Sequence, residues 1–171
     1  MKRCNGGYSL PELLVAMAVI GLLVGLAFQS GGETLARQRL EAAARRLGLG
    51  IDKARSEAQR QGQPCGLSLD ARGWGPPQSD GLPPCSRSLE SLKEPIGGGD
   101  LRLSHNLPAS LRFSRTGLVL DGGTVVLSSA GTPLRRCLVM ALPLGVVRLG
   151  RYRGDPLAPP SSGACEPDPS L

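Results

Sequence analysis

The sequence predicts an α+β protein in which a long N-terminal helix packs on a small antiparallel β-sheet domain. Three observations lead to this prediction: an uncharged apolar run from Leu13 to Phe28, a helical repeat of small apolar residues that ends near Gln61, and a series of short strand patterns beyond Gly62. The chain has 171 residues, which suits one modest domain beyond an anchoring segment.

The first half of the helix, residues 8–29, is predicted to be a transmembrane and assembly segment. At roughly 1.5 Å per residue its apolar part just spans a bilayer core. Lys2 and Arg3 precede it and favour a cytoplasmic N-terminus. Glu12 lies at the start of the apolar run, where a carboxylate costs roughly 2.5 to 3.5 kcal/mol on insertion. We therefore expect Glu12 to need a positively charged partner from another copy of the chain.

The junction before the apolar run reads Gly6-Gly7-Tyr8-Ser9-Leu10-Pro11-Glu12. A secretory signal would place its small-residue cleavage site after the apolar region rather than before it. The junction closely resembles that of type IV pilins and pseudopilins. This resemblance implies that a prepilin peptidase removes the leader, residues 1–7, by cutting after Gly7 and that it methylates the new N-terminus at Tyr8. It also implies that Glu12 neutralises the N-terminal amine of a neighbouring pilin subunit.

The same resemblance predicts where the protein resides. The precursor is expected to be a single-pass protein of the inner membrane, with its C-terminal domain in the periplasm or outside the cell. After assembly the protein is expected in the pilus.

The second half of the helix, residues 30–61, is predicted to be amphipathic. Small apolar residues recur at steps of three and four from Ala36 to Ala58, so one face of this half should pack against a sheet. Gly62 and Pro64 end the helix, and Gly31-Gly32 predicts a loosened point because glycine has poor helix propensity.

Residues 62–155 are predicted to form a β-rich extracytoplasmic domain. Short spacers between its strand patterns predict antiparallel pairing. Residues 71–99 read as a long loop rich in Gly, Pro and Ser, which makes them a candidate partner or adhesion surface. Residues 156–171 read as a Pro- and Ser-rich tail. The strand patterns lie at 101–104, 111–114, 123–127, 137–142 and 145–149.

Two further motifs narrow the resemblance to the FimT and GspH group of minor pilins. Arg55-Ser56-Glu57-Ala58, followed by Gly62-Gln63-Pro64, resembles the helix end and first strand entry of that group. Phe113-Ser114-x-x-Gly117 resembles its strand core. The resemblance therefore covers both the N-terminal third and the strands.

Cysteine usage predicts two disulfide bonds. Cys4 falls in the leader, and the four remaining cysteines form an even set, as expected in an oxidising compartment. Four cysteines permit three connectivities. We favour the pairs Cys65 with Cys85 and Cys137 with Cys165, because each would close a loop that is poor in regular structure.

The sequence predicts no metal site, no cofactor and no enzyme. It has no Cys-x-x-Cys pair, and His105 is the single histidine. It also has no phosphate-binding glycine loop and no nucleophile signature beside that histidine.

Positive charge is concentrated in the second half of the chain. Eight arginines lie between Leu101 and Arg153, against one acidic residue, Asp121. Guanidinium groups bind phosphate oxygens in a bidentate manner, tyrosine can stack on a base, and glycine allows close backbone approach. The candidate nucleic-acid surface is Arg148, Gly150, Arg151, Tyr152 and Arg153, joined across a hairpin by Arg135 and Arg136. A solvated arginine rim that keeps the domain soluble is the competing interpretation.

Gly150-Arg151-Tyr152-Arg153 matches the Gly-Arg-x-Arg motif that FimT-type minor pilins use for DNA binding. The resemblance thus implies a minor pilin of a type IV pilus that binds double-stranded DNA non-specifically for natural transformation. The alternative is a GspH-like pseudopilin of type II secretion, or a structural subunit that primes pilus assembly, without DNA binding.

Overall fold

The computed structural model describes residues 9–70, 72–78, 81–85, 101–142 and 145–168. The chain divides into two compact units, residues 1–35 and 36–171, and each is described by itself. The predicted processing residues Gly7 and Tyr8 lie outside the described residues.

Helix α1, Leu10–Gln61, contributes to both units and confirms the predicted N-terminal helix. It continues through Gly31 and Gly32, where the sequence predicts a loosened point. In the second unit the predicted small apolar stripe is buried. Gly48 belongs to this face, and a Cβ there would lie 3.8 Å from Cγ1 of Val147, in ordinary van der Waals contact. The buried stripe consists of Ala36, Leu40, Ala43, Ala44, Leu47, Ile51, Ala54 and Ala58.

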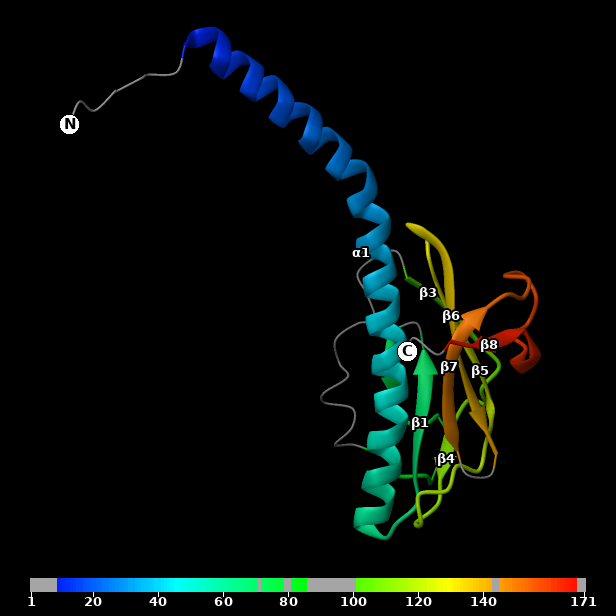
Figure 1. The fold of residues 1–171 in the computed structure, drawn as a ribbon. Helices are drawn as coiled ribbons and strands as arrows, with labels where there is room; N and C mark the ends of the chain where they lie inside the picture. The colour runs from blue at the N-terminus through cyan, green and yellow to red at the C-terminus, as the bar shows by residue number, and fades with distance from the viewer. Residues whose placement is uncertain (1–8, 71, 79–80, 86–100, 143–144, 169–171) are drawn as a thin grey trace, which may run out of the picture. The chain divides into compact units, whose positions relative to one another are not determined.

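The strands form two antiparallel sheets beside α1 (Figure 1). The three-stranded sheet has the order β2-β1-β4, with β1 at Cys65–Asp70, β2 at Gly73–Gly75 and β4 at Leu111–Phe113. The five-stranded sheet has the order β3-β5-β6-β7-β8. Its strands are β3 Leu101–His105, β5 Gly123–Ser129, β6 Thr132–Ala141, β7 Val146–Tyr152 and β8 Cys165–Pro167. This is the predicted α+β fold.

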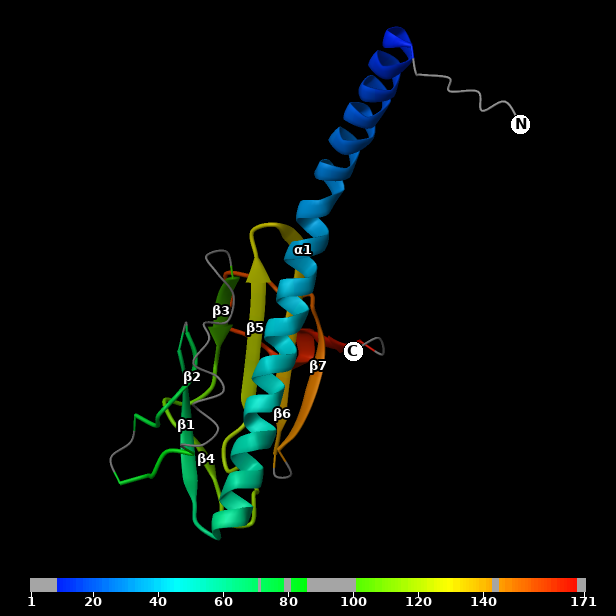
Figure 2. The same ribbon diagram turned by 90° about the vertical axis from the view of Figure 1, so that its left-hand side faces the viewer.

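The two faces of the five-stranded sheet have separate hydrophobic clusters. Val125, Leu138 and Leu149 are cross-strand neighbours and belong to the main core, which includes the buried stripe of α1. Val126 and Cys137 are the neighbouring positions on β5 and β6, and they face the other way. They form a smaller cluster together with Val139, Tyr152 and Cys165. Figure 2 shows α1 in front of the layer that β5, β6 and β7 form.

Three features differ from the sequence prediction. Gly73–Gly75 is a strand rather than part of a loop, because Trp74 is buried and its Nε1 donates a 3.0 Å hydrogen bond to the carbonyl oxygen of Leu47. The consecutive strands β3 and β4 lie in different sheets, since β3 pairs with β5 and β4 pairs with β1. Within the predicted tail, a short 3-10 helix at Ser162–Ala164 leads into β8.

Both disulfides join the pairs that the loop argument favours. Cys65 bonds to Cys85, with 5.2 Å between their Cα atoms. Cys137 bonds to Cys165, with 5.9 Å between their Cα atoms, and so connects β6 to β8 across β7. The second bond secures the C-terminal strand to the centre of the sheet.

Arg55 joins the end of α1 to two turns of the β domain. Its Nε donates to the carbonyl oxygen of Gly117 at 3.2 Å, and its Nη1 donates to the carbonyl oxygen of Gly145 at 3.2 Å. Both glycines have positive φ, +76° and +61°, which other residues rarely adopt. The helix motif and the strand motif that narrow the family resemblance therefore contact each other in the fold.

We expect Arg55→Ala to destabilise the domain by roughly 2 to 3 kcal/mol, because hydrogen bonds from a charged donor are the stronger kind and two carbonyls lose their partner. Equilibrium denaturation of the purified chain measures this. Arg60→Ala, at an exposed position in the last turn of the same helix, is the matched control. Equal stability of the two variants would show that Arg55 does not hold the turns.

Candidate functional site

The predicted assembly residue Glu12 lies in the first turn of α1. The backbone N–H and the hydroxyl of Ser9 each donate to Oε2 of Glu12 at 3.4 Å. Ser9-Leu10-Pro11-Glu12 is thus a capping-box sequence, in which a glutamate reaches back to the first unpaired N–H of the helix. This role of Glu12 in capping its own helix was not predicted, although the Ser-x-x-Glu spacing signals it. At 3.4 Å these bonds are long, and Glu12 stays exposed.

The large apolar side chains on both sides of Glu12 in the helix are exposed. Their exposed fractions run from 47% for Val24 to 74% for Leu10, far above what core residues show. In the part of the chain that the structure describes, no helix is both long enough and apolar enough to cross a membrane. The exposed set is Leu10, Leu13, Leu14, Val15, Met17, Val19, Ile20, Leu22, Leu23 and Val24.

The predicted nucleic-acid residues lie together on β6 and β7, but the sheet divides them between its two faces. Arg136 on β6 pairs directly with Arg151 on β7, so these two lie on the face that is turned to α1. Arg148 pairs with Val139, a member of the smaller cluster, and so lies on the opposite face. The sequence alone does not reveal how the residues of β6 and β7 pair, so these arginines were expected to form one surface.

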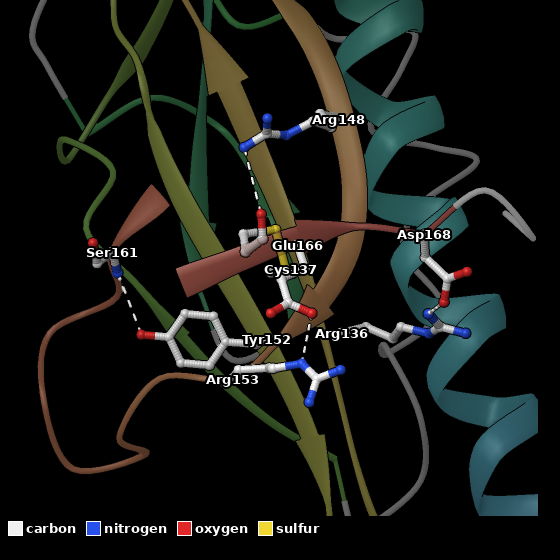
Figure 3. The surroundings of a disulfide bond; sticks show 9 residues. Arg136, Cys137, Arg148, Tyr152, Arg153, Ser161, Glu166 and Asp168 are labelled. Atoms are coloured by element: carbon white, nitrogen blue, oxygen red, sulfur yellow. Dashed lines mark hydrogen bonds and ion pairs between the residues drawn. A yellow bond between two sulfur atoms is a disulfide. The ribbon is translucent and has the colours of Figure 1, made fainter. Parts of the chain in front are cut away.

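Arg136 is buried, which corrects its predicted contact with DNA. Arg136 is 3% exposed, and its Nη1 lies 2.6 Å from Oδ2 of Asp168 (Figure 3). Its Nη2 lies 2.7 Å from Oε1 of Glu41. Burial disfavours the charged guanidinium, but its hydrogen bonds to these two carboxylates outweigh the effect of burial, and the pKa of Arg136 is raised. Arg136 therefore joins β6 to α1 and to the segment after β8.

Tyr152 and Gly150 are also structural rather than exposed. Tyr152 is 6% exposed, and its hydroxyl accepts a 3.3 Å hydrogen bond from the N–H of Ser161, as Figure 3 shows. Its ring is therefore not free to stack on a base. A Cβ on Gly150 would lie 2.1 Å from the carbonyl oxygen of Glu166, so glycine is needed here for β8 to approach β7.

Three arginines of the predicted set remain exposed. Arg153 donates from Nε to Oε2 of Glu166 at 2.5 Å, and both side chains are more than half exposed. Arg148 makes a 3.5 Å contact from Nη2 to the carbonyl oxygen of Cys165. Arg151 is exposed and has no ion pair with any residue in the described ranges. Arg135 is half-buried and donates from Nη1 to the carbonyl oxygen of Gly154 at 2.7 Å.

A further arginine, absent from the predicted set, holds the turn before β5. Arg112 forms a bidentate pair with Asp121 at 2.9 and 2.8 Å, and its backbone N–H also donates to Asp121 at 3.1 Å. The hydrogen bond from the Arg112 side chain holds the pKa of Asp121 below its usual value. Asp121 is the single acidic residue in the segment that contains the eight arginines, and it is therefore already paired with Arg112.

Among the described residues, no group of three or more metal-ligating side chains is found. Of the predicted surface loop, residues 71, 79–80 and 86–99 lie outside the described residues. A partner or adhesion surface in this segment therefore stays a prediction.

The structure combines a helix that has a carboxylate in its first turn, exposed apolar side chains along the start of that helix, and an antiparallel β domain. This combination defines a pilin-like filament subunit. Two family models match the chain. The model described as Type II transport protein GspH matches residues 43–143, and the model described as Prokaryotic N-terminal methylation motif matches residues 2–28. The chain therefore belongs to the GspH family, the type IV minor pilins and pseudopilins of the GspH/FimT type. No curated protein and no solved structure gives a significant match to the chain.

Family membership carries general consequences. It implies anchoring in the inner membrane before assembly, prepilin processing at the N-terminus and assembly with other pilin subunits. Proteins of this family are structural subunits rather than enzymes. The GspH match ends at residue 143, so Arg148, Arg151 and Arg153 lie beyond the matched range.

We expect Glu41→Gln to destabilise the domain by roughly 1 to 2 kcal/mol, because it leaves part of a buried guanidinium without its charged partner. Thermal unfolding of the full chain measures the change. Asp52→Asn, at an exposed position of the same helix, is the control and should leave the midpoint nearly unchanged. If Glu41→Gln behaves like the control, Asp168 alone holds Arg136.

Proposed function

We propose that this protein is a minor subunit of a type IV pilus. A prepilin peptidase cuts after Gly7 and methylates Tyr8, and the mature chain leaves the inner membrane with its β domain outside the cytoplasm. Glu12 then neutralises the N-terminal amine of a neighbouring subunit. The observation that supports this proposal most strongly is the exposed Glu12 at the head of a helix whose apolar side chains have no cover within the described residues.

Glu12 has two possible uses, capping its own helix and pairing with a neighbour, and they can be separated. Ser9→Ala removes one of the two capping donors and leaves the carboxylate, whereas Glu12→Ala removes the carboxylate itself. A partner amine gains far more from a carboxylate in apolar surroundings than the exposed cap does.

We expect Glu12→Ala to reduce incorporation into filaments by at least tenfold, while Ser9→Ala stays within about twofold of the unmodified chain, in line with the small energy of an exposed cap. Immunoblots of sheared filaments measure incorporation, and membrane levels of each variant control for expression. Similar losses in both variants would assign Glu12 to the helix cap and refute the pairing.

We further propose that the β domain contacts double-stranded DNA through the exposed arginines Arg151 and Arg153. Arg151 is the cross-strand neighbour of Glu166, which also pairs with Arg153, so these two arginines share one face, whereas Arg148 lies on the other face. An exposed ion pair such as Arg153 with Glu166 contributes little stability, so a phosphate can replace the carboxylate. Arg151 has no such partner to release. Contacts of this kind are made to phosphate and carry no sequence information, which suits uptake of any DNA. Gly150, Tyr152, Arg135 and Arg136 support this surface from within the sheet.

We expect the full chain in detergent to bind a random-sequence duplex with an affinity that falls steeply with salt. The double variant Arg151→Ala, Arg153→Ala should bind at least tenfold more weakly, with a salt slope lower by about 2, one for each lost phosphate contact. Arg39→Ala, Arg45→Ala, at two exposed positions of α1, is the charge-matched control. Equal losses of affinity in both double variants would show that only general electrostatic attraction, and no specific surface, binds the DNA.

A pseudopilin of type II secretion is the second candidate, and the match to the Type II transport protein GspH family favours it. The two functions predict different deletion phenotypes. Loss of protein secretion with intact pili supports the pseudopilin, whereas lost DNA uptake with intact secretion supports the minor pilin.

A further inference from the structure

Two apolar groups at the surface of the β domain have no role in the functions described so far. The first, the apolar tip, is Pro156, Leu157, Ala158 and Pro159 in the segment between β7 and β8. The second, the apolar patch, is Leu118, Leu120, Leu142 and Val146 on two neighbouring turns. Each group is exposed, and the two lie beyond opposite ends of β7.

The apolar tip is exposed along its whole length. All four of its residues are exposed, and the side chain of Leu157 is 94% exposed, the highest value among the large apolar residues described. Single exposed leucines are ordinary, but runs of three or four exposed apolar residues are unusual unless they have a function. Asp155 fixes the turn, because its Oδ1 accepts a 2.9 Å hydrogen bond from the N–H of Leu157.

The segment that carries the apolar tip is anchored at both ends. At its base, the N–H of Arg153 donates to the carbonyl oxygen of Ala164 at 2.9 Å, and the Cys137–Cys165 disulfide follows directly. Beyond the tip, the buried Pro160 accepts a 2.9 Å hydrogen bond from Nδ2 of Asn106. A loop that is ordered before binding loses little entropy on binding, which favours a role in recognition.

The apolar patch is formed by two turns that touch. A Cβ on Gly122 would lie 3.2 Å from Cγ of Leu142, and a Cβ on Gly145 would collide with the side chain of Val119. The turn between β4 and β5 therefore packs against the turn between β6 and β7. The exposed fractions of the four apolar side chains run from 40% for Leu118 to 56% for Leu142 and Val146.

The positions of tip and patch suit contact between copies rather than contact within one copy. Strand β7 has seven residues, so Val146 at its start and the segment beyond Tyr152 are separated by roughly 20 Å. Figure 1 and Figure 2 both show the start of β7 and the segment between β7 and β8 at opposite ends of that strand. Two different surfaces at opposite ends of one subunit can make a head-to-tail contact between two copies.

Charge beside the two apolar groups is complementary. Asp155 is exposed next to the apolar tip, and Arg115 is exposed three residues before Leu118 of the apolar patch. Arg115 has no ion pair with any residue that the structure describes. A copy that places its tip on the patch of the next can therefore bring a carboxylate near an unpaired guanidinium, which sets the orientation of the contact.

We propose that the apolar tip of one copy docks on the apolar patch of a second copy of this chain, with Asp155 facing Arg115 across the contact. This proposal rests on the proposed filament function and adds a contact between β domains to the one made by the N-terminal helices. A lipid surface fits less well, because the tip has one large side chain and a carboxylate beside it.

The test is oxidative cross-linking of two differently tagged full-length chains in detergent, both carrying Cys4→Ser. A chain with Leu157→Cys should form a disulfide with a chain carrying Leu120→Cys, at least fivefold more than with a chain carrying Leu49→Cys. Leu49 is 56% exposed on α1, against 51% for Leu120, so accessibility is matched. Equal yields at both positions would overturn the docking, as would a tip that links only to other pilin subunits or reacts only with lipid.

Charge removal provides the second measurement. Asp155→Asn, which keeps the oxygen that accepts from the N–H of Leu157, or Arg115→Gln alone should lower the yield of the Leu157→Cys to Leu120→Cys link at least threefold, and combining the two changed chains should cause little further loss. Losses that multiply in the combination would refute the proposed pair. If Glu12→Ala blocks filament incorporation while the link fails to form, the filament function stands and the docking falls. The reverse outcome leaves the docking intact and removes the filament function.

Discussion

The β domain depends on close packing between the second half of α1 and its sheets. Alanines and glycines along the buried stripe let β6 and β7 approach the helix, as the contact distance at Gly48 illustrates. Trp74 then joins β2 to the helix through the carbonyl oxygen of Leu47, and Arg55 joins the end of the helix to two turns of the β domain. Larger residues on this stripe would push the sheets away and break these polar contacts as well.

The position of the short strand β8 determines which arginines are exposed to solvent. The Cys137–Cys165 bond holds it against β7, and Gly150 gives its backbone room. The segment after it places Asp168 on the buried Arg136, whereas Glu166 meets the exposed Arg153. A residue type suited to phosphate binding is thus used partly for structure, and only the exposed remainder is available to a partner.

The two units place different demands on their surroundings. In the N-terminal unit, large apolar side chains are exposed along a helix that has Glu12 in its first turn, so this unit reaches a stable environment only with other molecules. The β domain has its own core and two disulfides, and its remaining exposed apolar groups are confined to turns. This division suits a subunit whose β domain is stable by itself and whose N-terminal helix packs against other subunits in an assembly.

The sequence by itself determined the helix and its buried stripe, most strand positions and the disulfide pairs, because periodicity and spacing are local signals. Only the tertiary structure decided that β3 and β4 part into different sheets, that Arg136 and Tyr152 are buried, and that Arg148 and Arg151 occupy opposite faces. Those outcomes depend on strand register and on β8, and a one-residue difference in register moves every side chain to the other face.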